Sequence, residues 1–241
     1  MLYATLTPAE KRLTFRASLA SGRLQLVPGA FNPLSAKLIE DRGFDGVYIS
    51  GAVIAADLGL PDIGLTTLTE VAYRAKQISR MTDLPSLVDA DTGFGEPMNV
   101  ARTVQELEDA GVAGLHIEDQ VNPKRCGHLD GKAVVDADTA TKRIRRAKAL
   151  VDAGADAIFP EAMRDLAEFE AIRAAVEVPI LANMTEFGKS ELFTNDQLAS
   201  VGINLVIYPV SLLRLAMGAA ERGLDTIKRE GSLTSEVPNM Q

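Results

Sequence analysis

The residues best suited to chemistry lie in one segment of this 241-residue chain, residues 114–128. A short apolar run leads to acidic side chains and then to a loop, residues 124–128, with the sequence Lys-Arg-Cys-Gly-His and the chain's only cysteine. A lone cysteine is usually a small buried hydrophobic residue, but three basic neighbours argue against burial here. Cations close to a thiol also lower its pKa. We therefore interpret Cys126 as a reactive group on a mobile loop.

Carboxylates at the ends of two predicted strands form a second candidate site. Asp89 and Asp91 are two residues apart, so both point to one face of an extended strand, and His116 and Glu118 have the same spacing. Three carboxylates at one mouth repel each other unless a cation lies between them, and oxygen-only ligands suit Mg2+. The spacing predicts a metal site of Asp89, Asp91 and Glu118. His116 is better explained as a hydrogen-bonded interior residue than as a ligand.

A glycine-rich loop follows the first two acids. Residues 91–95, Asp-Thr-Gly-Phe-Gly, precede a predicted helix, where backbone amides could hold an anion. The Gly-Lys-Ser/Thr of a Walker loop is absent, and no Gly-x-Gly-x-x-Gly follows the first predicted strand, which argues against a dinucleotide fold. The basic residues between 142 and 146 are expected to be a solvated helix face.

Repeated helix-then-strand units must position these groups. A helix end, a glycine, three residues and an apolar strand recur at Gly43, Gly111, Gly154 and Gly202. This repetition predicts a parallel sheet covered by helices. A first helix is expected from Thr7-Pro8 to about residue 21. The predicted strands lie near residues 26, 48, 87, 116, 158, 181 and 206.

Polar residues follow the ends of successive predicted strands, which is how a (β/α)8 barrel builds an active site. Turns are polar for other reasons too, and that alternative stays open, although carboxylates predominate where Asn, Gly and Ser are usual. We predict one α/β domain over residues 1–241, a (β/α)8 TIM-type barrel with seven of its eight strands. The residues at these strand ends are Asp89, Asp91, Glu118, Asp119, Glu161, Asn183, Thr185, Glu186, Tyr208 and Ser211.

The composition limits the possible functions. A hydrophobic fraction of 46% with 24% charged residues is typical of a globular protein. The net charge of −8 argues against nucleic-acid binding, and an anionic substrate would need a metal or clustered basic residues. A single cysteine excludes an intrachain disulfide and fits a reducing compartment. Neither a secretory signal nor an apolar run of membrane-spanning length is evident, so we expect a soluble cytoplasmic protein.

These motifs closely resemble those of the isocitrate lyase/phosphoenolpyruvate mutase superfamily, and of its 2-methylisocitrate lyases in particular, from about Phe15 to the C-terminus. The most specific motif is the loop at residues 124–128, which resembles the catalytic loop of the lyases. The supporting motifs are residues 88–95, 116–120, 159–162 and 181–188.

The resemblance implies a lyase of the methylcitrate cycle that cleaves a carbon–carbon bond of 2-methylisocitrate, giving pyruvate and succinate in propionate catabolism. It implies Mg2+, with Mn2+ as an alternative, on Asp89, Asp91 and Glu118, and a homotetramer. Its implied catalytic residues are Cys126 as general acid, Arg125 and His128 as partners of substrate carboxylates, and Tyr48 as a candidate base or, equally, a packing residue. Its implied substrate-binding residues are Ser50, Gly51, Asp62, Lys124, Gly127, Glu161, Asn183 and Thr185.

The chain departs from the family pattern in three places. Ser50-Gly51-Ala52 replaces a frequent Ser-Gly-Gly, and the sequence stops short of a C-terminal helical region that relatives exchange between subunits. The largest departure is a strand–helix unit, with a substrate-binding arginine, that relatives carry between the positions matching Arg145 and Ala147. Here residues 139–152 read as one helix. A barrel without that strand would have two unpaired edges beside the site.

Two explanations of the missing unit stay open. We favour the one in which the sequence as given omits these residues, and an intact mass well above 25.8 kDa would support it. If the protein lacks them, we expect little or no lyase activity. A catalytically silent homologue is then the alternative function. Whether or not the unit is present, a second alternative is another lyase of the superfamily, acting on isocitrate or a related 2-hydroxy or 2-oxo acid.

Overall fold

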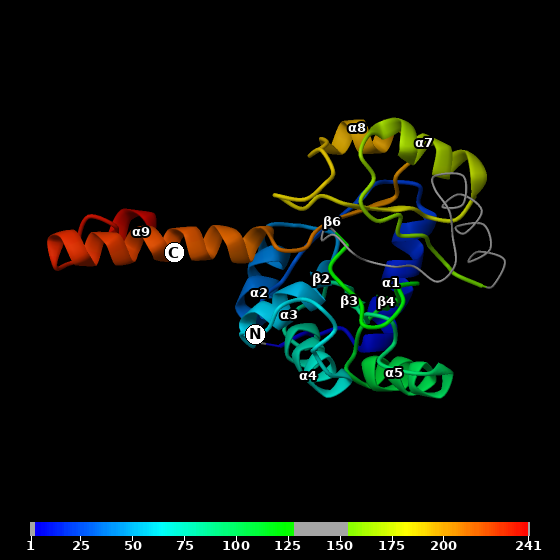
Figure 1. Cartoon of the computed structure of the whole chain (residues 1–241), viewed down its shortest axis with the longest axis horizontal. Helices are drawn as coiled ribbons and strands as arrows, with labels where there is room; N and C mark the ends of the chain where they lie inside the picture. The colour runs from blue at the N-terminus through cyan, green and yellow to red at the C-terminus, as the bar shows by residue number, and fades with distance from the viewer. Residues whose placement is uncertain (1–2, 128–153, 241) are drawn as a thin grey trace.

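The computed structural model describes residues 3–127 and 154–240 and alternates strands with helices along most of the chain (Figure 1). The strands are β1 (Gln25–Pro28), β2 (Val47–Ile49), β3 (Ser86–Asp89), β4 (Gly114–His116), β5 (Leu181–Asn183) and β6 (Leu205–Tyr208). The helices are α1 (Pro8–Ala20), α2 (Pro33–Asp41), α3 (Gly51–Asp57), α4 (Leu68–Ser79), α5 (Pro97–Asp109), α7 (Leu166–Ala175), α8 (Asn195–Ser200) and α9 (Ser211–Glu230), followed by the short 3-10 helix η1 (Val237–Asn239).

Every strand pair in the described residues is parallel. β2, β3 and β4 form one sheet, and β1, β6 and β5 form another, in that order. A bridge between Gly29 and Tyr48 joins β1 to β2, and a bridge between Ile158 and Ile180 extends the wall beside β5. The last strand therefore returns to pair with the first, as in a TIM-barrel-like α/β fold. All the strands end at one rim, because parallel strands run the same way.

The predicted strands are confirmed at six of their seven positions, and the seventh, near residue 158, is only the isolated bridge. Within the described residues, β4 has a strand partner on one side only, β3. Residues 128–153 connect β4 to the bridge at Ile158 and lie outside the described residues. The predicted helix at residues 139–152, with its basic face at 142–146, therefore stays a prediction, as does the missing unit.

The first helix begins where the sequence predicts. Thr7 caps α1, because its hydroxyl accepts the Glu10 amide at 3.3 Å while the Glu10 carboxylate accepts the Thr7 amide at 2.7 Å. Lys11 is buried and donates to the carbonyl oxygens of Ser79 and Thr82 at 2.7 and 2.5 Å. These contacts fix α1 across the N-terminal ends of the strands, opposite the rim that carries the acids.

Three apolar clusters hold the strands in place. The inner cluster consists of side chains from five strands that fill the space inside the wall, so the barrel interior is packed rather than open. The second cluster lies between β2–β4 and helices α2–α5, and the third lies between β5–β6 and helices α7 and α8. Figure 1 shows these two groups of helices on opposite sides of the wall. The inner cluster consists of Val27, Tyr48, Leu87, Leu181, Leu205 and Ile207, with Phe15 and Phe159 packed against it.

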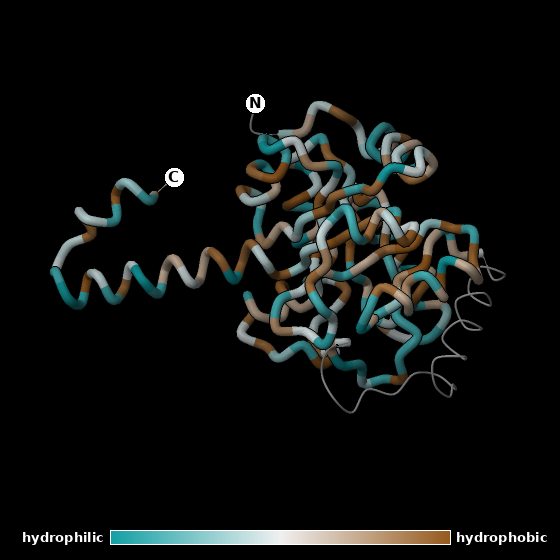
Figure 2. The backbone as a smooth tube through the Cα atoms, turned by 90° about the horizontal axis from the view of Figure 1, so that it is seen from above, coloured by the Kyte–Doolittle hydropathy of each residue, from teal (hydrophilic) through white to brown (hydrophobic). Residues whose placement is uncertain are grey.

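Helix α9 projects away from the barrel, and the last residues fold back along it (Figure 2). Hydrogen bonds from Thr226 to Glu236 and from Ser235 to Glu230 hold this return. Several large apolar side chains of α9 are exposed, including Leu215 and Leu224 at 69% and 67%. Of the helices described, none combines the length and apolarity needed to cross a membrane.

Candidate active site

Three acids meet at the C-terminal rim of β3 and β4. Asp89 ends β3 opposite His116, and the pairing continues past the strands, where the Glu118 amide donates to the Asp91 carbonyl at 2.7 Å. This register puts Glu118 beside Asp91. One carboxylate oxygen from each of Asp89, Asp91 and Glu118 lies within 4.8 Å of the others. The structure thus brings the three predicted acids together.

Burial and repulsion from Asp89 make two of these acids, Asp91 and Glu118, hold protons more strongly than exposed carboxyl groups do. Burial, then the charge of Asp89, raises the pKa of Asp91 to about 6 and that of Glu118 to about 8. Burial also acts to raise the pKa of Asp89, but His116, Lys124 and two backbone amides outweigh it and lower that pKa. A hard divalent cation would relieve this repulsion, and three close carboxylate oxygens are the donors that Mg2+ prefers. The donor set therefore fits the predicted metal.

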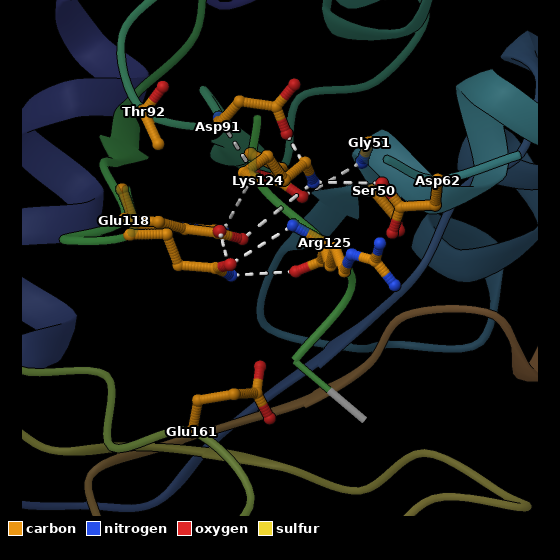
Figure 3. A network of polar contacts seen from close by, with 12 residues as sticks. Ser50, Gly51, Asp62, Asp91, Thr92, Glu118, Lys124, Arg125 and Glu161 are labelled. Carbon is orange, nitrogen blue, oxygen red and sulfur yellow. Dashed lines mark hydrogen bonds and ion pairs between the residues drawn. The ribbon is translucent and has the colours of Figure 1, made fainter. Parts of the chain in front are cut away.

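Lys124 lies among these acids, although it belongs to the loop that the sequence predicts to be exposed. Its side chain is only 2% exposed, and its Nζ is 2.5 Å from Asp91 Oδ1, 2.9 Å from Asp62 Oδ1 and 3.9 Å from Glu118 Oε1 (Figure 3). Burial acts to lower the pKa of Lys124, but the surrounding carboxylates outweigh it and raise that pKa, so the side chain is an ammonium. Asp62 joins the site through this contact.

The loop that carries Cys126 is fixed to the same rim. The side-chain Nε2 of Gln120 donates to Glu118 Oε2 and to the Arg125 backbone carbonyl, each at 2.7 Å. The Gln120 side-chain oxygen accepts a hydrogen bond from the Arg125 backbone amide at 3.1 Å. The Cys126 amide donates to the Asp62 carbonyl at 3.2 Å, and the residue is partly exposed. Sequence reasoning did not single out Gln120, yet its spacing of two from Glu118 continues the alternation begun at His116.

Tyr48 and His116 form a hydrogen-bonded pair beside the acids. The Tyr48 hydroxyl lies 2.7 Å from His116 Nε2, and that nitrogen is 3.8 Å from Asp89 Oδ1. Burial and the nearby carboxylates raise the pKa of Tyr48 well above its usual range, and burial lowers the pKa of His116. The phenol is therefore protonated and the imidazole neutral. Phe159 packs edge-on against the imidazole, with ring centres 5.1 Å apart.

The start of α3 lies directly against Asp89. Ser50 caps this helix, and the Gly51 amide donates to Asp89 Oδ2 at 3.2 Å. A Cβ on Gly51 would lie 2.9 Å from the same oxygen, closer than real Cβ atoms come. The close approach of backbone to carboxylate therefore favours glycine at this position, because any larger residue would have to displace the Asp89 side chain.

The remaining predicted residues lie at the ends of later strands. The Asn183 side-chain amide donates to Glu161 Oε1 at 3.4 Å, and Glu161 sits so close to Gly127 that a Cβ there would clash with its side chain. Figure 3 shows Glu161 apart from the acid cluster around Lys124. Thr185 accepts a hydrogen bond at 3.1 Å from Arg214, a residue of α9 that sequence reasoning missed. His128 lies outside the described residues.

Comparisons with known proteins agree on one family. The family model for phosphoenolpyruvate phosphomutase matches residues 15–148 and 129–228. A Corynebacterium glutamicum protein named Probable 2-methylisocitrate lyase 2 is 56% identical, over 99% of this chain and 87% of its own length. The 2-methylisocitrate lyase of Escherichia coli is 40% identical, over 94% of this chain and 88% of its own. A solved phosphonopyruvate hydrolase in complex with oxalate and Mg++ superposes with a TM-score of 0.85 at 26% identity, covering 98% of this chain and 92% of that one.

Proposed function

The chain belongs to the phosphoenolpyruvate phosphomutase family, within the isocitrate lyase/phosphoenolpyruvate mutase superfamily, and from this premise we propose that it is a carbon–carbon lyase that cleaves 2-methylisocitrate to pyruvate and succinate. The identities of 56% and 40% to proteins with that name support this substrate. The observation that carries the proposal is that the Cys126 loop and the three acids share one rim, joined through Lys124 and Gln120.

Mg2+ is the proposed cofactor, with Mn2+ as an alternative, and Asp89, Asp91 and Glu118 would hold it. When bound, the ion would polarise the hydroxyl and adjacent carboxylate of the substrate. A hydrolase of the same fold has been solved with oxalate and Mg++, which supports the pairing of a small carboxylate with this ion.

Residues of the chain then move the protons. Loss of the substrate's hydroxyl proton lets the carbon–carbon bond break, with its electron pair passing to the carbon that becomes part of succinate. The Cys126 thiol supplies the proton to that carbon as general acid. Tyr48 is the candidate base: its phenol is protonated at rest, so it would need to pass its proton to the neutral His116 at 2.7 Å. The cycle closes when the proton on His116 passes to water and the Cys126 thiolate takes a proton from water, so no proton is consumed overall.

The substrate's carboxylates require donors and cations. Arg125 and His128 are proposed to neutralise them, and the amides at Ser50 and Gly51 to donate to them. Further proposed contacts lie around the rim. They come from Asp62, Lys124, Gly127, Glu161, Asn183 and Thr185.

The missing strand–helix unit remains part of the proposal. The alignment with the Corynebacterium glutamicum relative spans 268 positions, more than the 241 residues of this chain, so some internal stretch of that relative has no counterpart here. The family model also matches residues 129–148 twice. Both observations support the absence of a unit between β4 and Ile158. A homotetramer in the cytoplasm completes the proposal, and the exposed apolar residues of α9 support association between copies.

A product assay with two substrates tests the proposed reaction. The protein with Mg2+ is incubated separately with 2-methylisocitrate and with isocitrate, and pyruvate and glyoxylate are measured. We expect pyruvate from 2-methylisocitrate, at a kcat/KM well above that for glyoxylate release from isocitrate. Preferential glyoxylate release would favour the isocitrate alternative, and neither product would favour a catalytically silent homologue.

A further inference from the structure

Lys124 places a positive charge where the proposed divalent ion would lie. Its Nζ is 2.5 Å from Asp91 and 3.9 Å from Glu118, two of the three proposed ligands, and its side chain is 2% exposed. Asp62, at 2.9 Å, completes the cage around it. We propose that Lys124 is a tethered competitor for the cation site: its ammonium neutralises the acids when no ion is bound, and it moves out when the ion binds. This inference rests on the proposed metal site.

The contacts of Lys124 show why the two cations compete. Mg2+ binds oxygens at about 2.0–2.1 Å, and the ammonium already lies on Asp91 Oδ1. The other oxygen of Asp91 faces the Thr66 hydroxyl at 3.4 Å. Two cations on one buried carboxylate would repel each other strongly, because little water screens them. Binding of the ion to Asp91 therefore favours departure of the ammonium from this carboxylate.

Displacement of Lys124 would also remove contacts that fix the Cys126 loop to the rim. The contacts that tie this loop to the rim include the Lys124 ion pairs, the hydrogen bonds of the Gln120 side chain, and the hydrogen bond from the Cys126 amide to the Asp62 carbonyl. Cys126 is two residues from Lys124. Exchange of the ammonium for the metal would therefore remove one of these ties and couple metal loading to the position of the thiol.

Calorimetry on a matched pair of variants tests the competition. Lys124→Met removes the ammonium, and Lys76→Met removes an exposed lysine of α4 as a control for net charge. We expect Lys124→Met to bind Mg2+ about tenfold or more tightly than the unaltered protein, and Lys76→Met to bind it within about twofold. Unchanged or weaker binding by Lys124→Met would overturn the inference. The absence of Mg2+ binding in all three proteins would overturn the metal site as well, which separates the two failures.

Chemical footprinting of the unaltered protein tests the movement itself and needs no variant to fold. Lysines are acetylated briefly with and without Mg2+, and the modification of Lys124 is followed by mass spectrometry relative to Lys76. We expect Lys124 to be protected without the ion and to react severalfold faster with it. Equal protection in both states would mean that Lys124 stays in place, and the exchange would be wrong.

Discussion

Lys124 and the three acids Asp89, Asp91 and Glu118 are charged groups that lie close together at the rim that carries the Cys126 loop. Their charges affect how strongly each of them holds a proton or a cation. The ammonium and the carboxylates lie within one buried cluster, where electrostatic interactions are stronger than in water. Cys126 lies at the edge of this cluster, partly exposed. A partly exposed thiol can reach both the substrate and water, as the proposed role of Cys126 as general acid requires.

The role of Cys126 predicts a specific kinetic loss. A serine hydroxyl is a far weaker acid than a thiol, so Cys126→Ser should lower kcat by roughly 10²–10⁴-fold, the usual contribution of a general acid. The affinity for Mg2+ should stay within about twofold, because no carboxylate changes. Steady-state kinetics and calorimetry measure the two effects. Turnover equal to that of the unaltered protein would show that another group donates the proton.

Gly51 offers a test of how tightly the acids are positioned. A Cβ at Gly51 would meet Asp89 Oδ2 at 2.9 Å, so Gly51→Ala should lower the free energy of unfolding by about 1–3 kcal/mol and weaken Mg2+ binding. The control is Gly218→Ala in the exposed helix α9, where the nearest atom would be 3.6 Å away. That change should be neutral or stabilising by up to about 1 kcal/mol. Denaturant unfolding of both variants checks the difference, and equal effects would contradict the crowding at Gly51.

The sequence predicts which acids meet but not which side chain lies between them. Spacing of two along neighbouring parallel strands is enough to bring Asp89, Asp91 and Glu118 to one face. The burial of Lys124 could not be predicted in this way, because it depends on how the loop after Gln120 folds back over the rim. Arg214 was missed for a related reason: its partner Thr185 lies 29 positions away in the sequence.

Short-range sequence patterns predict most of the helices and strands. The predicted strand near residue 158 is shortened to a bridge, and the cause lies in its own sequence. Next to β5, the Ile158 amide donates to the Pro179 carbonyl and the Leu181 amide to the Ile158 carbonyl, each at 2.9 Å. The next donor in this parallel pattern would be residue 160, which is a proline without an N–H. An apolar run predicts a strand here, whereas Pro160 reduces it to a bridge.

The contact between Glu186, in the loop after β5, and α9 predicts a dependence of stability on pH. Burial acts to raise the pKa of Glu186, but hydrogen bonds from Ser211 and Arg214 outweigh it and lower that pKa. A lowered carboxyl pKa adds stability at pH values above the unfolded pKa, and this stability is lost as the pH falls through the folded value. The group is about one third exposed, so solvent screening limits the contribution to about 1 kcal/mol or less.

Thermal unfolding of Glu186→Gln between pH 7 and pH 3 measures this contribution. The variant should be less stable than the unaltered protein at pH 7, and the difference should shrink toward pH 3. Glu191→Gln, at an exposed position, is the matched control and should show no such trend. A difference that stays constant with pH would indicate that the carboxylate charge does not stabilise this contact.

In the molecule as a whole, the interval between β4 and Ile158 is where the described residues contain no strand to join the two sides of the wall. Strand pairs and bridges connect Ile158 through β5, β6, β1, β2 and β3 to β4, so among the described residues only the interval from β4 back to Ile158 is unpaired. The alignment with the Corynebacterium glutamicum relative is also longer than the chain. The sequence predicts the barrel class because its helix–strand units repeat. It cannot predict how the wall closes, because closure depends on strands far apart in the chain.

Intact mass spectrometry of the protein purified from its natural source addresses this directly. We expect a mass well above 25.8 kDa, from residues that complete the wall. A mass equal to that of the 241 residues would mean that the barrel has two unpaired edges beside the site, and lyase activity should then be slight or absent.

We propose that acids from neighbouring strands and a thiol on the loop above them together cleave 2-methylisocitrate with the help of a divalent ion. The most direct test measures pyruvate and succinate formed from 2-methylisocitrate by the same natural protein, before chelation, after chelation and after Mg2+ is returned. Pyruvate and succinate should form in equal amounts. Their formation should stop on chelation and resume when Mg2+ is returned. A rate that chelation leaves unchanged, or no pyruvate under any condition from a protein with the complete wall, would contradict the claim.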